Sequence, residues 1–423
     1  MEKNEFLYLS YLSPPLLAGG VARVENNCKL LPVYGWEPTL LTACVENSSE
    51  TDTNFAQNGV NVLRPNCFLK ENKVRALPKK KGNKISLKSA FLKGLARWFL
   101  MPDRQVLWNR SAKKLALSKA EEHDWKCVFA CLNPISTVGL GYDLAKKLNL
   151  PFVMEFQDII CNHYEGGPPT FLHRYLRTSI VRKAASYAKA VIVMSNSMKD
   201  WVVKNMPVKA ENVYVIPIGF VSADQDYIFS QAIKQNDKFT MVYAGTFQRD
   251  RRPDVTFRAL KMLLNDNRIS ADKIKLVLIS NLDKSIVSEF GVEQVTEVLS
   301  MMPRKDVFRW YAKADLLLLI CDKMSYQNYT VPGKIFEYLM TEKPILGLAD
   351  KTSEISQILN KAGTGYTADA DDIEEVAGRI YYYYKLWENN ELKSEANKDY
   401  INTFSCGRLV KQLGDILAEV TKK

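Results

Sequence analysis

The sequence predicts an α/β protein with two doubly wound, Rossmann-like parallel-sheet domains that face each other across a cleft. Short apolar stretches of strand length alternate with helical stretches, as is typical of parallel sheets covered on both faces. This alternation restarts near residue 239, after a polar stretch at 221–237. The length of 423 residues also suggests two cores, because single cores stop growing at about 250–300 residues.

The first domain is expected to span residues 1–218. Apolar runs bounded by polar or glycine-rich text predict its strands, and helical spacing predicts its helices; in 21–32, for example, Val24, Cys28 and Leu31 share one face. The predicted strands are 6–10, 36–42, 61–64, 126–131, 151–156, 190–194 and 213–219. The predicted helices are 21–32, 139–148 and 171–189.

The second domain is expected to span 219–400, with 221–237 as a polar connection. The same criteria predict strands at 239–244, 274–279, 316–320 and 344–348. Residues 373–388 and 407–421 read as closing helices, and the segment 401–423 is expected to pack back toward the first domain. Ligands of such folds bind at the carboxyl ends of the strands, so the cleft is the expected site.

Composition excludes several classes of protein. No apolar run approaches the roughly 20 residues that span a bilayer, and the polar start does not resemble a signal peptide. The eight cysteines form no CxxC pair, which favours free thiols in a reducing cytoplasm over disulfides or zinc. The only DxD-like text, Asp369-Ala-Asp371, precedes Asp372 and a predicted helix, so an acidic helix start explains it better than a metal site.

Positive charge is concentrated in residues 70–119. This segment has 15 Lys and Arg against two acidic residues, a net +13, whereas the rest of the chain sums to −2. Within it, 87–99 has apolar residues on one helical stripe and Lys93 and Arg97 facing away, and Lys79–Lys81 precedes it. A basic amphipathic helix suits an anionic membrane surface. The alternatives are a helix that covers the first sheet and, without any recognition motif, nucleic-acid binding, which we do not expect.

The segment from Val331 to Glu337 carries the most specific pattern. Pro332-Gly333 opens a short helix, Lys334 lies in its first turn, and Glu337 follows three residues later. A helix start with a lysine suits a diphosphate, and the carboxylate could accept hydrogen bonds from a ribose diol. The alternative is structural, because Pro-Gly helix starts and acidic first turns are common.

Several segments, in order along the chain, together resemble one known family. They are 15–23 (PLLAGGVAR), 35–42 (GWEPTLLT), 152–158 (FVMEFQD), 216–220 (IPIGF), 243–247 with 251–253 (YAGTF, RRP), and 332–339 with 343–346 (PGKIFEYL, KPIL). This pattern resembles the retaining glycosyltransferases of family 4, which have the GT-B fold, and their bacterial polysaccharide branch in particular. The resemblance implies a cytoplasmic, metal-independent enzyme without cofactor, peripheral at the inner face of the cell membrane. It would move a sugar from a nucleotide-diphosphate donor, a UDP-sugar, to a glycan or lipid-linked acceptor in surface polysaccharide synthesis.

The resemblance also implies roles for individual residues. Arg251 and Lys334 would stabilise the charge of the leaving diphosphate, Asp158 would lie near the transferred sugar or the acceptor hydroxyl, and Glu337 would hold the ribose. The other residues expected to bind the donor are Gly19, Gly20, Gly245, Thr246, Arg252, Ser280, Arg304, Pro332 and Gly333.

The resemblance leaves several alternatives open. Asp158 could cap a helix, and Arg249 or Arg252 could replace Arg251. Tyr329 stands where the family has the first carboxylate of a glutamate pair, which leaves the donor sugar undecided; Gln157 also departs from the family, as does Ile218. The functional alternatives are a non-catalytic glycan- or membrane-binding protein, and a nucleotide-sugar epimerase or hydrolase on the same fold.

Overall fold

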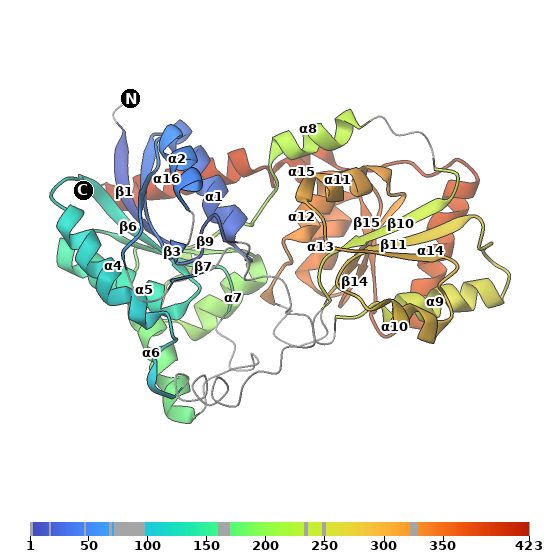
Figure 1. Cartoon of the computed structure of the whole chain (residues 1–423), viewed down its shortest axis with the longest axis horizontal. Helices are drawn as coiled ribbons and strands as arrows, with labels where there is room; N and C mark the ends of the chain where they lie inside the picture. Colours follow the sequence, from blue (N-terminus) through green and yellow to red (C-terminus); the bar gives the residue numbers. More distant parts are fainter. Residues whose placement is uncertain are drawn as a thin grey trace. The chain divides into compact units, whose positions relative to one another are not determined.

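The computed structural model describes residues 3–16, 18–45, 48–66, 70–71, 98–159, 170–231, 236–247, 251–321 and 329–422. The chain forms two compact units, residues 1–217 with 407–423, and residues 218–406. Each unit is a parallel sheet packed between helices (Figure 1). The predicted fold class, two Rossmann-like parallel-sheet domains, is therefore confirmed.

The first unit is built on a seven-stranded sheet with the order β4-β2-β1-β6-β7-β8-β9. Its strands are β1 (Asn4–Leu9), β2 (Trp36–Leu41), β4 (Asn61–Leu63), β6 (Trp125–Leu132), β7 (Phe152–Phe156), β8 (Ala190–Val193) and β9 (Val213–Val215). The central strands β1, β6 and β7 are almost wholly buried, as their continuous apolar text requires. A small separate sheet pairs β3 (Cys44–Val45) with β5 (Lys70–Glu71).

Helices cover both faces of this sheet. They are α1 (Val21–Leu30), α2 (Ser49–Gln57), α4 (Val106–Lys119), α5 (Ile135–Leu148), α6 (Phe171–Tyr187), α7 (Asn196–Asn205) and α16 (Cys406–Thr421), with short 3₁₀ turns at Leu31–Tyr34 and Ala210–Asn212. The C-terminal residues 407–423 belong to this unit. The Tyr34 hydroxyl donates to the Gly407 carbonyl at 2.9 Å and so joins the start of α16 to the turn before β2.

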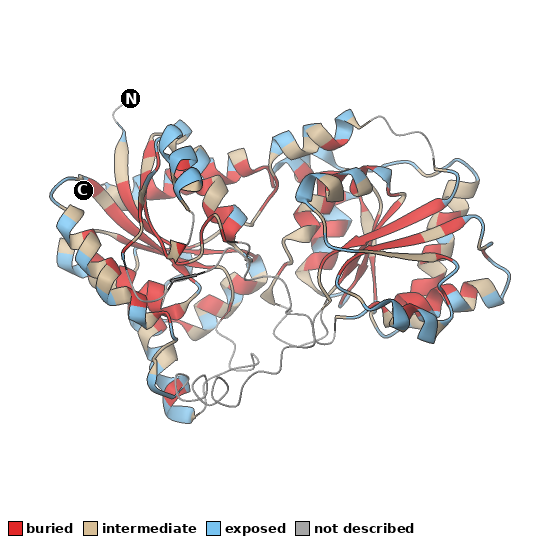
Figure 2. Ribbon diagram, viewed as in Figure 1, coloured by how far each residue is buried: buried red, intermediate tan, exposed pale blue. Residues whose placement is uncertain are grey.

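The second unit is a six-stranded sheet with the order β12-β11-β10-β13-β14-β15. Its strands are β10 (Phe239–Ala244), β11 (Ile274–Ile279), β12 (Thr296–Leu299), β13 (Leu316–Ile320), β14 (Ile345–Leu348) and β15 (Gly365–Ala368). Its helices are α8 (Ser222–Ser230), α9 (Asp254–Asn265), α10 (Lys284–Phe290), α11 (Arg304–Lys313), α12 (Lys334–Leu339), α13 (Glu354–Ala362), α14 (Ile373–Glu388) and α15 (Lys398–Asn402). Buried residues, red in Figure 2, fill the space between sheet and helices.

The structure corrects one expectation about this unit. The stretch 221–237, predicted as a polar connection, contains the helix α8, because Ile228 turns into the apolar core beside Phe220 while most of the other side chains of the helix stay at the surface. Two other details agree with the sequence. Asp372 caps α14 by accepting from the Glu375 amide, which confirms the structural interpretation of the acidic text. Cys67 and Cys161 lie outside the described residues, and the other cysteines are free thiols.

None of the helices in the described ranges is long and apolar enough to cross a membrane. Most of the basic segment, including Lys79–Lys81 and the apolar stripe up to residue 97, lies outside the described residues. Its C-terminal part is described, and there α4 packs against α5, with Trp108 fully buried.

Candidate functional site

The second unit places Lys334 at the carboxyl edge of its sheet. Pro332 and Gly333 precede α12, so Lys334 is the first residue of that helix. Its ammonium group lies 4.7 Å from the centroid of the Tyr243 ring, which belongs to β10. A Cβ at Gly245, directly after β10, would lie only 1.5 Å from the lysine Nζ. Glycine at 245 is therefore required, both for this close approach and for its φ of +148°.

The surroundings of Lys334 favour the binding of an anion. The pKa of Lys334 is lowered to about 8, mainly by burial and also by the nearby charge of Arg251, against the opposing effect of Glu337. The side chain still carries its charge at neutral pH, but at an energetic cost, because two cations share a place with little solvent. An anion bound between them would remove that cost. This physical argument favours Arg251 over the other arginines of its loop as the partner of Lys334.

The remaining residues of that loop have other contacts. Arg252 is exposed and pairs with Asp254 at 3.0 Å, at the start of α9. Arg249 lies outside the described residues. The Phe247 amide donates to Asn281 Oδ1 at 2.7 Å, and Asn281 Nδ2 donates back to the Phe247 carbonyl at 3.2 Å. Asn281 thus shapes the loop that contains Thr246.

Glu337 is held by an ion-pair cluster that the sequence did not reveal. Arg304 Nη2 lies 3.1 Å from Glu337 Oε1 and 3.1 Å from Asp224 Oδ2. The Tyr311 hydroxyl lies 3.5 Å from the other oxygen of Glu337. Burial raises the pKa of Glu337, while Arg304 and Lys334 lower it. Arg304, which is expected to bind the donor, bridges Glu337 to Asp224 of α8.

Ser280, which is also expected to bind the donor, follows β11 at the same edge of the sheet. Its hydroxyl accepts from the Leu282 amide at 3.2 Å, so the side chain stabilises its own turn. Gly333 packs close to Ile218, the first residue of the second unit, since a Cβ at Gly333 would lie 3.2 Å from the Ile218 side chain. Of the residues expected to bind the donor, the described part of the second unit places Lys334, Arg251 and Gly245 close together.

In the first unit, Gly20 lies against Gln157. Gly20 has a φ of +82° at the start of α1, and a Cβ there would lie 2.3 Å from Gln157 Oε1. The space around Gly19 is open, because a Cβ would have no neighbour within 4 Å among the described residues. Gln157 Nε2 in turn donates to Glu155 Oε2 at 3.0 Å. Gln157, one of the departures from the family pattern, thus lies between Gly20 and Glu155.

A buried ion pair anchors this arrangement. Arg23 Nε donates to Glu155 Oε1 at 2.8 Å, and both side chains are almost fully buried. Arg23 Nη1 donates to the carbonyl of Pro217 at 2.6 Å, the last residue before the second unit begins. Sequence reasoning missed this pair, although a glutamate within an otherwise apolar strand was a visible signal that a buried partner must exist.

Asp158 follows β7 at the carboxyl edge of the first sheet. Burial raises the pKa of Asp158 to about 6, so its carboxyl group can change charge near neutral pH. Ile159 is not helical, and residues 160–169 lie outside the described part. The next described helix, α6, is capped by Thr170, whose side chain accepts from the His173 amide.

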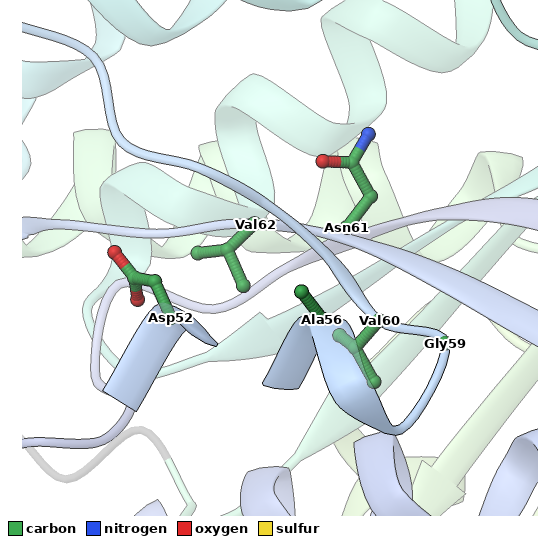
Figure 3. Close-up of a pocket in the computed structure, with 6 residues that line it drawn as sticks. All are labelled: Asp52, Ala56, Gly59, Val60, Asn61 and Val62. Atoms are coloured by element: carbon green, nitrogen blue, oxygen red, sulfur yellow. The ribbon is translucent and has the colours of Figure 1, made fainter. Parts of the chain in front are cut away.

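A surface hollow of about 410 Å³ lies in the first unit (Figure 3). It is lined by α2 and the edge strand β4, with Asp52 and Asn61 as its polar groups. Asp52 is already paired with Arg64 at 2.8 Å. No predicted donor residue lines this hollow. Among the described residues, no cluster of His, Cys, Asp and Glu is placed to hold a metal ion.

Comparison with known proteins agrees with the fold and the motifs. Residues 19–222 match the family described as Glycosyltransferase Family 4. The solved structures with the same fold include a glycosyltransferase from Rickettsia africae ESF-5 (14% identity, all of both chains, TM-score 0.69). Sucrose-phosphate synthase from Thermosynechococcus elongatus (12%, 99% of both chains, 0.70) and Anabaena HepE in complex with UDP (15%, 99% and 100%, 0.64) share it too. The chain shares the GT-B fold of these structures, and its match to glycosyltransferase family 4 covers residues 19–222.

One curated relative matches only locally. A stretch of 124 residues is 30% identical to mitogen-activated protein kinase 1 of Oryza sativa subsp. japonica, which covers 29% of this chain. The chain spans about a third (31%) of the length of that protein. A match of this extent does not show a shared fold or activity.

Proposed function

We propose that this protein is a retaining glycosyltransferase that moves a sugar from a nucleotide-diphosphate donor to a glycan or lipid-linked acceptor in surface polysaccharide synthesis. The observation that carries the proposal is the cluster of Lys334, Arg251 and Gly245. It combines two cations with a glycine whose missing side chain lets the Lys334 ammonium group lie against the backbone. The cluster is at the carboxyl edge of a parallel sheet. Diphosphates bind at such edges in doubly wound folds.

In this proposal the two cations stabilise the leaving group. Negative charge grows on the departing diphosphate as the bond to the anomeric carbon breaks, and fixed cations in a desolvated place act strongly on that charge. Lys334 and Arg251 take this role without a metal ion or other cofactor. Glu337 accepts hydrogen bonds from the ribose. In the first unit, Gly19 and Gly20 let the backbone approach the diphosphate and the sugar, and Asp158 lies near the transferred sugar or the acceptor hydroxyl.

We further propose a uridine nucleotide as the donor base, because a relative with the same fold was solved with UDP. The acceptor is proposed to be lipid-linked because the basic segment, through 79–99, suits an anionic membrane surface. The protein would then act as a peripheral protein at the cytoplasmic face of the membrane.

Nucleotide binding tests the proposal directly. Thermal unfolding of the wild type with UDP, GDP, ADP and CMP should show stabilisation by one of them, UDP in our expectation. Lys334→Ala should lose this stabilisation. Lys343→Ala is the matched control, because Lys343 is also partly buried in the same unit, but its Nζ donates to the Ala314 carbonyl at 2.7 Å near the opposite edge of the sheet. No stabilisation by any nucleotide would refute the donor site.

The products separate the remaining alternatives. A transferase yields a glycosylated acceptor and UDP, a hydrolase yields free sugar and UDP, and an epimerase returns a nucleotide-sugar of altered configuration. A protein that binds nucleotide yet forms none of these products would be a non-catalytic member of the family. Anomeric configuration in the glycosylated product tests retention.

A further inference from the structure

The first turns of α6 form an exposed apolar surface. Phe171, Leu172, Tyr175 and Leu176 are between 41% and 76% exposed, and Figure 2 shows pale blue over this end of the helix. The side chains of Trp98 (52% exposed) and Phe99 (78% exposed) belong to the same surface, because His173 Nε2 lies 3.0 Å from the Trp98 carbonyl and its ring contacts the indole at 5.4 Å. We call these six residues the α6 tip.

The tip belongs to a capped helix whose first half has few buried side chains. The buried apolar side chains of α6 are Val181, Ala184 and Ala185, all in its C-terminal half, which packs against α5. In the first two turns only His173 is buried. Thr170 caps the helix through the His173 amide. Residues 171–180 extend for roughly 15 Å at 1.5 Å per residue, so a stable helix presents apolar side chains to solvent.

Charge and composition identify what covers the tip. Helix α6 contains four Arg and Lys residues and no acidic residue, and the segment 70–119 that supplies Trp98 and Phe99 has a net charge of +13. Arg174 is exposed between Phe171 and Tyr175. Large apolar patches on a soluble surface mark interaction sites. Aromatic rings interleaved with basic side chains are suited to the interface of an anionic bilayer.

We propose that the α6 tip inserts into the interface of an anionic membrane and docks the first unit there. The inference rests on the proposed function only in that a lipid-linked acceptor would lie at this surface. It differs from the contact proposed through 79–99, because it names apolar side chains of α6 that enter the bilayer.

Flotation of the full-length protein with vesicles tests the docking. Vesicles of phosphatidylcholine with phosphatidylglycerol should carry the wild type, and vesicles of phosphatidylcholine alone should carry much less. The double variant F171S/L172S should partition at least tenfold more weakly. Arg174→Gln should weaken partitioning roughly fivefold, since one charge near such a surface contributes about 1 kcal/mol. Phe229→Ser, an exposed phenylalanine of α8, is the matched control and should float like the wild type.

The outcomes are distinct. Flotation of F171S/L172S at the wild-type level, or equal binding of the wild type to both kinds of vesicle, would overturn the proposal. If the double variant only dissociates a dimer in analytical ultracentrifugation, the tip is a self-association surface and not a membrane contact. Stabilisation of the wild type by UDP is measured in parallel. If UDP does not stabilise the wild type, the proposed donor site is refuted, but the docking result still stands.

Discussion

Replacing Lys334 by methionine is expected to stabilise the free protein while weakening donor binding. Methionine keeps an unbranched side chain but removes the ammonium group. In the wild type this group is placed against Gly245 and the Tyr243 ring, close to Arg251, where little water can solvate it. Binding sites commonly carry such unfavourable charges, which lower stability until the ligand arrives.

The magnitude follows from the pKa of Lys334. A pKa lowered from 10.5 to about 8 means that folding disfavours the charged form by about 3 kcal/mol. The contact of the ammonium group with the Tyr243 ring returns about 1 kcal/mol. The variant should therefore be about 2 kcal/mol more stable than the wild type at pH 7. Its affinity for UDP should fall roughly thirtyfold, because a hydrogen bond to a charged group contributes about 2 kcal/mol.

The stability difference must also depend on pH. Below pH 8 the lysine is protonated in both the folded and the unfolded chain, so the full penalty is present. Between pH 8 and 10.5 the folded protein loses its proton first, and wild-type stability rises relative to the variant. Above pH 10.5 the lysine is neutral in both states, and the difference should nearly vanish.

Native-state hydrogen exchange of peptides from β10 and β13 measures the stability of the second unit by itself, which matters because a two-domain chain need not unfold in one step. Calorimetric titration measures UDP affinity. Lys351→Met is the control, since Lys351 is exposed and its pKa is raised by its hydrogen bond with Glu375. A Lys334→Met variant that is less stable than the wild type at pH 7, or whose advantage does not shrink with rising pH, would refute the reasoning.

Three further substitutions test other parts of the site. Gly245→Ala should lower UDP affinity at least tenfold in titration, because its Cβ would occupy the place of the lysine ammonium group; Gly378→Ala, in open space on α14, should not. Asp158→Asn should stabilise the protein above pH 6, where the buried carboxyl group must otherwise ionise, and should abolish the fall in turnover expected below pH 6; a variant with the wild-type pH profile would contradict its role. Arg304→Gln should reduce the preference for UDP over 2′-deoxy-UDP, because Glu337 loses its ion pair; equal loss for both nucleotides would show that Arg304 does not act through the ribose.

The sequence predicted fully buried strands more accurately than half-buried strands and helices. The strands at 239–244 and 274–279 have the predicted bounds, since a continuous apolar run marks a strand buried on both faces. The edge strands β12 and β15 were not predicted, because half-buried edges mix polar and apolar residues without a clear period. Helix α8 was missed for a similar reason: a single apolar side chain, Ile228, is fully buried along its length.

By itself, the sequence determined the two-domain parallel α/β fold, the resemblance to glycosyltransferase family 4, and the motif from Pro332 to Glu337, because periodicity and short motifs are local properties of the chain. Only the tertiary structure decided which side chains meet. It placed Lys334 against Gly245, linked Glu337 through Arg304 to a helix within the predicted polar connection, and paired Arg23 with Glu155. These contacts join residues far apart in the chain, 132 positions in the case of Arg23 and Glu155. They depend on which strand ends lie side by side in each sheet, which a local pattern does not encode.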